Sequence, residues 1–308
     1  MVRRPSLAKG HTVAGFDIHR IGGRIGAEVV GVDPGGPLAD DVVRDLNAAL
    51  LAHKALVFRG ANLTDESQLE FAARFGPLTK AHPTGVPSVD GKPEVLPIDG
   101  DDHRANHWHT DCTFVRTPPK ASTLRGIVIP AYGGNTLIAN QAAAYLDLPR
   151  ELRELADKLW AVHTNDAGQP LLSTDRADEY RKMFLATIYK SVHPVVRVHP
   201  ESGERGLFVS GFAQQLVGYS ISESRAILDM LQRYVIRPEN VLRVRWTPGD
   251  LVLFDNRNTQ HYGPDDYDDQ PRMLHRVTIA GDVPVGVDGG KSYLLEGDDA
   301  AHYTPPVE

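Results

Sequence analysis

Apolar residues recur at helical spacing in several stretches of the chain. Between Asp40 and His53 they return every three or four positions, which places them on one face of a helix. A second helix is expected to start at Thr64 or Asp65, with Gln68 completing a capping pair with Asp65, and to end near Gly76. Two more helices are predicted, over Pro149 to Val162 and Ser222 to Ile236.

Short apolar or alternating runs, bounded by Pro, Gly, Asp or Asn, predict β-strands through much of the remaining chain. The predicted strands are Ala55 to Phe58, Ala121 to Ile129, Val195 to Val198, Leu207 to Val209, Val241 to Trp246, Leu251 to Phe254 and Met273 to Ile279. Pro200 to Glu204 and Thr247 to Asp250 are predicted to be hairpin connections. Because no repeat or flexible linker divides the chain, we expect one domain over residues 1–308, with helices outside a β-core.

Composition narrows the class of protein. The chain carries 33 Lys and Arg against 40 Asp and Glu, a net charge of -7, and it has no basic cluster, which argues against nucleic-acid binding. A single cysteine excludes an intrachain disulfide, and no apolar run is long enough for a membrane helix. The first 15 residues lack the apolar stretch of a signal peptide. We therefore expect a cytoplasmic protein that acts on small molecules without a membrane partner.

Three residues could hold a metal ion. The segment from Trp108 to Phe114 has the composition of a strand, so His109 and Asp111 would point to the same side. His261 follows an apolar strand and is the second candidate histidine. Two His and one carboxylate form the facial triad of non-haem Fe(II) oxygenases. One His-x-Asp pair arises readily by chance among 13 histidines, and His107 would share the same strand face.

Two arginines could bind anions. In a strand, Arg272 and Arg276 lie on one face and about 13 Å apart. The guanidinium fork matches carboxylates and sulfo groups, so the pair could hold two different anions. The alternative is a pair of surface arginines that neutralise the acidic loop from Asp265 to Asp269.

Together with further motifs, these elements resemble the Fe(II)/2-oxoglutarate-dependent dioxygenases of the taurine dioxygenase and alkylsulfatase group. The motifs that carry the resemblance are Trp108 to Asp111, Gly133 to Leu137, His193 to Arg197, Asp255 to His261 and His275 to Thr278. The similarity extends from about Gly15 to Val285. It implies an α/β fold with a mainly β core, a double-stranded β-helix or jelly roll flanked by helices.

The resemblance also implies roles for seven residues. The catalytic Fe(II) ligands would be His109, Asp111 and His261. Thr136 and Arg272 would bind 2-oxoglutarate, and His82 and Arg276 would contact the substrate. The implied reaction uses O2 and 2-oxoglutarate to hydroxylate the carbon bearing a sulfonate or sulfate ester. It releases sulfite or sulfate, an aldehyde, succinate and CO2. Members of the group usually form dimers or tetramers, so a homo-oligomer is expected.

Two positions depart from the taurine enzymes. These enzymes carry an Asn four residues before the first metal His and a Tyr three residues after the substrate-side His, where this chain has Ala105 and Gly85. Without those polar groups the ammonium of taurine would be buried without partners. The segment from Arg104 to Trp108 is more similar to the alkylsulfatases. An alkyl sulfate or alkyl sulfonate is therefore favoured, with taurine as the alternative.

Two other functions would use the same residues. A zinc-dependent hydrolase would use the His, Asp and His ligands to activate water, and would turn over without O2. A non-catalytic β-barrel would bind an anion through its arginines alone. The long segments from Pro83 to Pro97 and from Asp166 to Tyr189 are expected to be loops beside the site that order when substrate binds.

Overall fold

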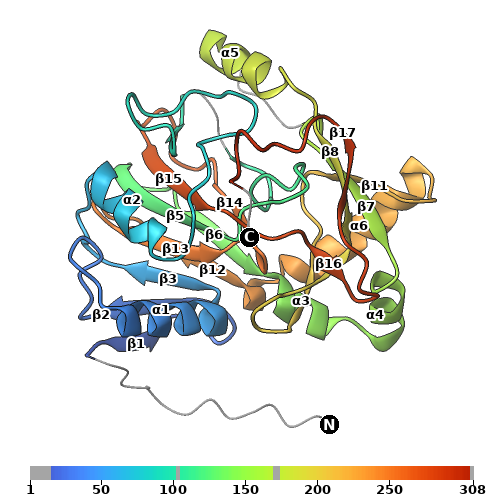
Figure 1. Ribbon diagram of the computed structural model, residues 1–308, viewed down its shortest axis with the longest axis horizontal. Coiled ribbons are helices and arrows are strands. Elements are labelled where there is room, and N and C mark those ends of the chain that lie inside the picture. The colour runs from blue at the N-terminus through green and yellow to red at the C-terminus, as the bar shows by residue number, and fades with distance from the viewer. Residues whose placement is uncertain (1–14, 102–104, 169–173, 306–308) are drawn as a thin grey trace.

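A computed structural model describes residues 15–101, 105–168 and 174–305 as a β-rich core with helices around it (Figure 1). The helical segments are α1 (Asp40–His53), α2 (Asp65–Ala73), α3 (Gln141–Asp147), α4 (Arg150–Ala156), α5 (Asp175–Phe184), α6 (Ile221–Val235) and the short η1 (Pro238–Asn240). The strands are β1 (Asp17–Arg20), β2 (Ala27–Val30), β3 (Ala55–Phe58), β4 (Val95–Asp99), β5 (Ala121–Val128), β6 (Thr136–Asn140), β7 (Trp160–Thr164), β8 (Lys190–Pro194), β9 (Val196–Val198), β10 (Arg205–Leu207), β11 (Ala213–Leu216), β12 (Val241–Val244), β13 (Leu251–Asp255), β14 (Thr259–Tyr262), β15 (Met273–Ile279), β16 (Val285–Gly286) and β17 (Tyr293–Glu296).

The largest sheet has the strand order β1-β2-β3-β13-β5-β15-β4. Helices α1 and α2 cover one of its faces, where Leu46 and Phe71 pack against Leu253 of the central strand β13. The neighbouring residues Val252 and Phe254 point to the opposite face, into a second apolar cluster. Because both faces of β3 and β13 are buried, their sequences are continuous apolar runs rather than alternating ones.

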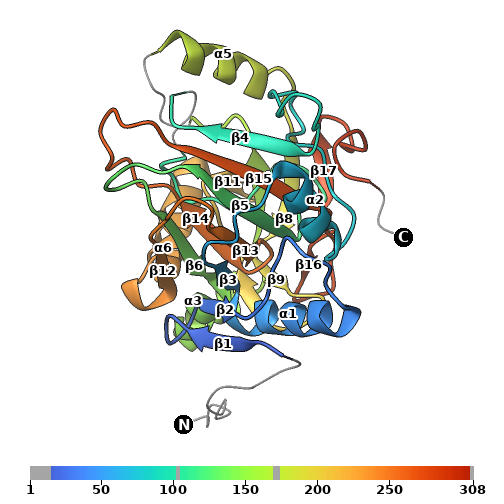
Figure 2. The same cartoon turned by 90° about the vertical axis from the view of Figure 1, so that its left-hand side faces the viewer.

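Smaller sheets form a second layer. Their strand orders are β12-β6-β14, β11-β7-β8-β17 and β10-β9-β16. Ile138 of β6 and Leu242 of β12 share an apolar cluster with Phe254, which joins this layer to the large sheet. Helices α3, α4 and α6 pack against the second layer, and Figure 2 shows α5 at the end of the molecule opposite α1. The predicted β-core with outer helices is confirmed.

Several predicted elements are confirmed at their boundaries. The helix Asp40–His53 and the strands Ala55–Phe58 and Met273–Ile279 occur as expected. Residues 200–204 connect the antiparallel strands β9 and β10, so this hairpin prediction is also correct. Within the described residues, none of the helices has the length and apolar character needed to span a bilayer.

Other local predictions were wrong. Helix α4 ends at Ala156, and Trp160 already begins strand β7, so the helix predicted to Val162 is two elements. Residues 247–250 are not a hairpin, because β12 pairs in a small sheet and β13 in the large one. Helix α2 is capped by Thr64 and Ser67, while Gln68 is buried and donates a hydrogen bond to Thr123.

Candidate active site

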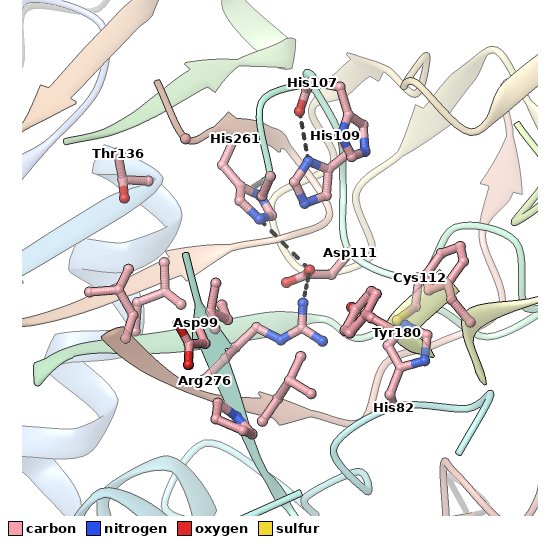
Figure 3. A pocket seen from close by; sticks show the side chains of 18 of the residues that line it. His82, Asp99, His107, His109, Asp111, Cys112, Thr136, Tyr180, His261 and Arg276 are labelled. Carbon is pink, nitrogen blue, oxygen red and sulfur yellow. Dashed lines mark hydrogen bonds and ion pairs between the residues drawn. The ribbon is translucent and has the colours of Figure 1, made fainter. Parts of the chain in front are cut away.

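The two histidines and the aspartate singled out from the sequence meet in the lining of one cleft (Figure 3). His109 and His261 face each other across an isolated β-bridge, with N···O distances of 3.0 and 2.7 Å between their backbones. One ligand atom from each of His109, Asp111 and His261 lies within 4.8 Å of the others. Across the described part of the chain, this is the one cluster of three His, Cys, Asp or Glu side chains with such spacing.

The local backbone differs from the predicted strand. After the bridge at His109 the chain enters a turn from Asp111 to Phe114, in which Cys112 has a φ of 51°. This left-handed residue lies after Asp111 and ends the alternation of side chains there, whereas His109 and Asp111 meet in one cluster as their two-residue spacing predicts. Cys112 is buried and borders the cleft, instead of facing away from it as a regular strand would require.

The electrostatics of the cluster suit metal binding. Burial raises the pKa of the Asp111 carboxyl, but the adjacent Arg276 guanidinium and the two histidines outweigh this effect and hold the pKa at about 2. Ser122 of β5 donates a hydrogen bond of 2.7 Å to Asp111 Oδ2. Burial lowers the pKa of His261 to about 4, with Arg276 contributing in the same direction. A carboxylate and a neutral imidazole, the forms that bind metals, therefore stand side by side at neutral pH.

The backbone of His107 orients the His109 ring through a hydrogen bond. Its carbonyl oxygen lies 2.8 Å from Nδ1 of His109, and a carbonyl can only accept a hydrogen bond. The proton of neutral His109 is therefore on Nδ1, which leaves the lone pair of Nε2 for a metal. The His107 side chain is outside the three-residue cluster, so the alternative ligand considered from the sequence does not join it.

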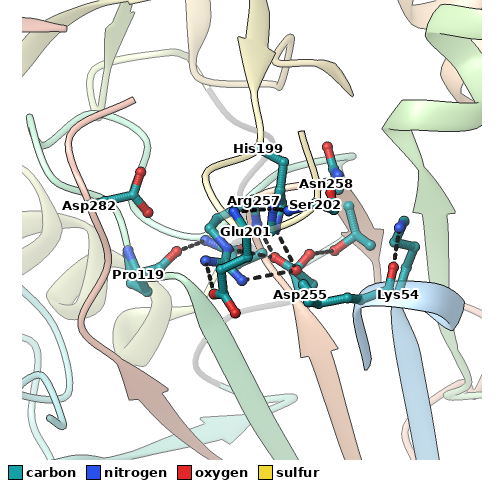
Figure 4. Close-up of polar contacts among 12 residues, drawn as sticks. Lys54, Pro119, His199, Glu201, Ser202, Asp255, Arg257, Asn258 and Asp282 are labelled. Carbon is teal, nitrogen blue, oxygen red and sulfur yellow. Dashed lines mark hydrogen bonds and ion pairs between the residues drawn. The ribbon is translucent and has the colours of Figure 1, made fainter. Parts of the chain in front are cut away.

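The backbone of Asp111 is also held in place. Asn256, in the turn between β13 and β14, accepts a hydrogen bond from Asp111 N at 2.9 Å and donates one to Asp111 O at 3.2 Å. The turn itself is fixed by Asp255, which is fully buried and accepts hydrogen bonds from Arg257 and His199 (Figure 4). This polar network therefore anchors the segment that leads from Asn256 to His261.

Replacing Asp255 with Asn should lower the free energy of unfolding by about 3 kcal/mol, because it leaves the buried Arg257 without one of its anionic partners. Arg257 holds the pKa of Asp255 below its usual value, against the opposing effect of burial. The contribution of Asp255 is therefore fully present above about pH 4 and is lost as the pH falls further. Urea unfolding of both proteins at several pH values measures the difference.

A surface pair provides the control for this substitution. Asp157 forms an ion pair of 3.0 Å with the exposed Arg205, and Asp157→Asn should cost less than about 1 kcal/mol. Equal losses from the Asp255 and Asp157 substitutions would contradict the anchoring role of Asp255.

One side of the cleft presents Thr136 and Arg272, both buried. Arg272 Nε donates a hydrogen bond of 2.8 Å to the carbonyl of Gly134, and its guanidinium lies 5.9 Å from the centre of the Tyr267 ring. Among the described residues it forms no ion pair. The alternative of two surface arginines neutralising the loop from Asp265 to Asp269 is therefore wrong, and this guanidinium is available to a carboxylate.

Gly134 could not be replaced at this point. It has a φ of 60°, and a Cβ there would lie 2.7 Å from Pro130 Cγ and 3.1 Å from Arg272 Cδ. Its N–H donates to Asp266 Oδ1 at 2.8 Å, so part of the acidic loop holds the glycine turn in place. No sequence pattern indicates this role of the loop.

The other side of the cleft presents Arg276 and His82. Arg276 forms a buried ion pair with Asp111 and donates to the carbonyl of Ala81 at 3.3 Å. His82 Nδ1 is 2.8 Å from the hydroxyl of Thr84. The whole cleft, polar groups included, holds about 850 Å³ of empty space when open solvent is counted. Its apolar lining residues are Leu96, Pro97, Ile98, Phe114, Leu124, Phe184, Phe212 and Leu274.

The two positions that depart from the taurine enzymes differ in whether they line the cleft. Ala105 lines the cleft, whereas Gly85 is not among its lining residues, and Arg104 lies outside the described residues. The segment from Asp166 to Tyr189, expected to be a loop, contains helix α5, which contributes Tyr180 and Phe184 to the cleft wall.

Two histidines and a carboxylate that meet in a cleft of a β-core are the arrangement expected of non-haem Fe(II) oxygenases. The chain matches the family described as "Taurine catabolism dioxygenase TauD, TfdA family" over residues 17–278, and it belongs to this family. Its co-substrates are accordingly 2-oxoglutarate and O2. The zinc hydrolase and the non-catalytic barrel considered from the sequence are not supported.

Individual relatives narrow the comparison. The chain is 50% identical to an alpha-ketoglutarate-dependent sulfate ester dioxygenase of Pseudomonas putida over 290 residues, covering 92% of this chain and 96% of that protein. It is 45% identical to an alkylsulfatase of Acinetobacter baylyi, covering 91% and 90%. The crystal structure of a taurine dioxygenase from Burkholderia xenovorans superimposes with a TM-score of 0.79 at 38% identity, covering 94% and 99%. The predicted jelly-roll fold class is therefore confirmed.

Proposed function

We propose that this dioxygenase oxidises the carbon that bears the sulfate group of an alkyl sulfate ester. The observation that carries the proposal is the buried Arg276 beside the His and Asp cluster, at the end of an apolar cleft. A guanidinium matches a sulfo group, and the aliphatic and aromatic lining suits an alkyl chain. Relatives named for sulfate esters and alkyl sulfates, at 50% and 45% identity, support this substrate class.

Taurine fits the cleft less well. Besides Asp111, the other carboxylate among its described lining residues is Asp99, and Arg176 lies 2.9 Å from it as an ion pair. Ala105 offers no polar side chain. The ammonium of taurine would therefore lose its hydration without gaining an equivalent partner.

Fe(II) is the proposed metal, held by His109, Asp111 and His261. Two neutral imidazoles and a carboxylate fit this ion and leave adjacent positions for co-substrates. When bound, iron and 2-oxoglutarate together supply the chemistry that activates O2. Thr136 and Arg272 would bind the distal carboxylate of 2-oxoglutarate, while Arg276 and His82 would orient the sulfate group next to the metal site.

The reaction balances without a further reductant. One oxygen atom of O2 enters the substrate as a hydroxyl on the carbon bearing the sulfate, and the other enters succinate as 2-oxoglutarate loses CO2. The hydroxylated carbon then expels sulfate, with cleavage of its C–O bond, and becomes an aldehyde. The homo-oligomer and the cytoplasmic location remain predictions.

Aerobic turnover tests the substrate assignment. With Fe(II) and 2-oxoglutarate, we expect hexyl sulfate to release sulfate and succinate in equal amounts, and taurine to produce little of either sulfite or succinate. Hexyl sulfonate, which lacks the oxygen between carbon and sulfur, is the control for the effect of that oxygen in hexyl sulfate. Taurine-dependent sulfite release at the higher rate would contradict the proposal, and sulfate release without O2 would contradict the dioxygenase reaction.

A further inference from the structure

Thr136 is held by a tryptophan that lies outside the residues considered so far. Trp246 follows strand β12, which pairs with β6 so that Val244 lies opposite Thr136. Two residues beyond this pair, the indole Nε1 of Trp246 reaches back to the hydroxyl oxygen of Thr136 at 2.9 Å. Both side chains are buried, and Thr136 also borders the cleft, on the His261 side of Figure 3.

The direction of this hydrogen bond is fixed by chemistry. An indole N–H can only donate, so the Thr136 oxygen must accept. The hydroxyl proton of Thr136 is then left to donate elsewhere, and the structure gives it no acceptor among the described residues. If the Thr136 hydroxyl instead donated to a backbone carbonyl, its proton would not be available to a ligand in the cleft. The contact with Trp246 therefore makes Thr136 a donor toward the cleft.

The same end of the cleft holds a second oriented donor. Arg272 Nε bonds to the carbonyl of Gly134, two residues before Thr136, so the guanidinium and the hydroxyl are anchored to one short segment. Burial strengthens donors that face an anion, provided that they are already oriented when it arrives.

We propose that Trp246 is a positioning residue for 2-oxoglutarate, which orients the Thr136 hydroxyl toward the distal carboxylate of this co-substrate. The inference rests on the proposed role of Thr136 and adds a residue of the core to it. Trp246 is not among the residues that line the cleft, so its effect should be confined to the affinity for molecules that carry the distal carboxylate.

Calorimetry on the full-length, Mn(II)-loaded protein tests this directly, with N-oxalylglycine as a non-reactive analogue of 2-oxoglutarate. Trp246→Phe keeps an aromatic ring in the core but removes the N–H, and should weaken analogue binding about fivefold. Thr136→Val removes the donor itself and should weaken binding about tenfold or more. In the Thr136→Val background, Trp246→Phe should have no further effect, because its partner is gone.

Two controls separate positioning from packing. Trp160→Phe removes an indole that lies outside the cleft lining and should leave binding unchanged. If Trp246→Phe does not fold, 3-benzothienylalanine at position 246 keeps the bicyclic shape without the N–H and should give the same fivefold loss. In turnover, the KM for 2-oxoglutarate should rise while the KM for hexyl sulfate stays constant.

Distinct outcomes would overturn the proposal. An unchanged affinity in the variant lacking the indole N–H, or an equal loss in the Thr136→Val background, would show that Trp246 acts only through packing. An equal rise of both KM values would show the same. A wild-type protein that binds no N-oxalylglycine and forms no succinate would instead overturn the proposed function, and this inference with it.

Discussion

Replacing His109 or Asp111 with Ala should abolish iron-dependent succinate formation while leaving the protein folded. The ligand atoms of His109, Asp111 and His261 lie within 4.8 Å of one another, so each substitution removes a third of the proposed donor set. Loss of an outer partner of a metal ligand alone costs roughly 10- to 100-fold in affinity or activity, and loss of a ligand should cost more. Iron content after anaerobic reconstitution and succinate formation measure the two effects.

The control for these variants is His275, a histidine of the large sheet that does not line the cleft. His275 lies on β15 and pairs with Asp65 at 2.6 Å, on the helix-covered side of the sheet. His275→Gln should retain iron. An alanine variant of His109 that bound one iron per chain and formed succinate at the wild-type rate would contradict the assignment of this site.

The central strands β3 and β13 of the large sheet could be predicted from the sequence because they are buried on both faces, whereas β1, β2 and β4 were not predicted. Continuous apolar runs such as Leu251 to Phe254 have no competing helical spacing and end at turn residues. Helix α5 could not be predicted in this way. Most of its side chains are charged or polar, and its apolar contacts are made by Tyr180, Met183 and Phe184 at one end. Its amphipathic stripe is therefore too short to stand out from a loop.

The site was predictable to the extent that its residues form local motifs. His109 and Asp111 stand two positions apart and Arg272 and Arg276 four, and all four line the cleft, so their sequence spacing carries information, although Arg272 lies just before β15 rather than within it. The contacts that hold these residues in place cannot be recognised from sequence spacing. Asn256 reaches Asp111 across 145 positions and Trp246 reaches Thr136 across 110, and neither pair has a sequence pattern. These contacts depend on strand pairing between distant segments, which only the assembled sheets provide.

The buried ion pair between Arg276 and Asp111 links the proposed substrate side of the cleft to the proposed metal ligands. Arg276 enters from β15 next to β5, the strand that carries Ser122. Asp111 therefore receives Arg276 on one carboxylate oxygen and Ser122 on the other. A sulfate group held by the same guanidinium would lie close to the aspartate ligand. In the proposed function, Arg276 would therefore place the sulfur-bearing end of the substrate next to the proposed metal ligands.

Substitutions of the two arginines should have separate effects on the KM for hexyl sulfate and on the KM for 2-oxoglutarate. Arg276→Gln should raise the KM for hexyl sulfate at least about 30-fold, and Arg272→Gln should do the same for 2-oxoglutarate, since loss of one partner of a buried charge pair costs roughly 2 to 5 kcal/mol. Each variant should leave the other KM within a few-fold of wild type. Because Arg276 also contacts Asp111, iron content is measured for both variants, so that a change in metal affinity is not counted as a change in substrate binding. A rise in the KM for 2-oxoglutarate alone in Arg276→Gln would reverse the assignment, because it would place the co-substrate, and not the sulfate, on the arginine that touches the aspartate ligand.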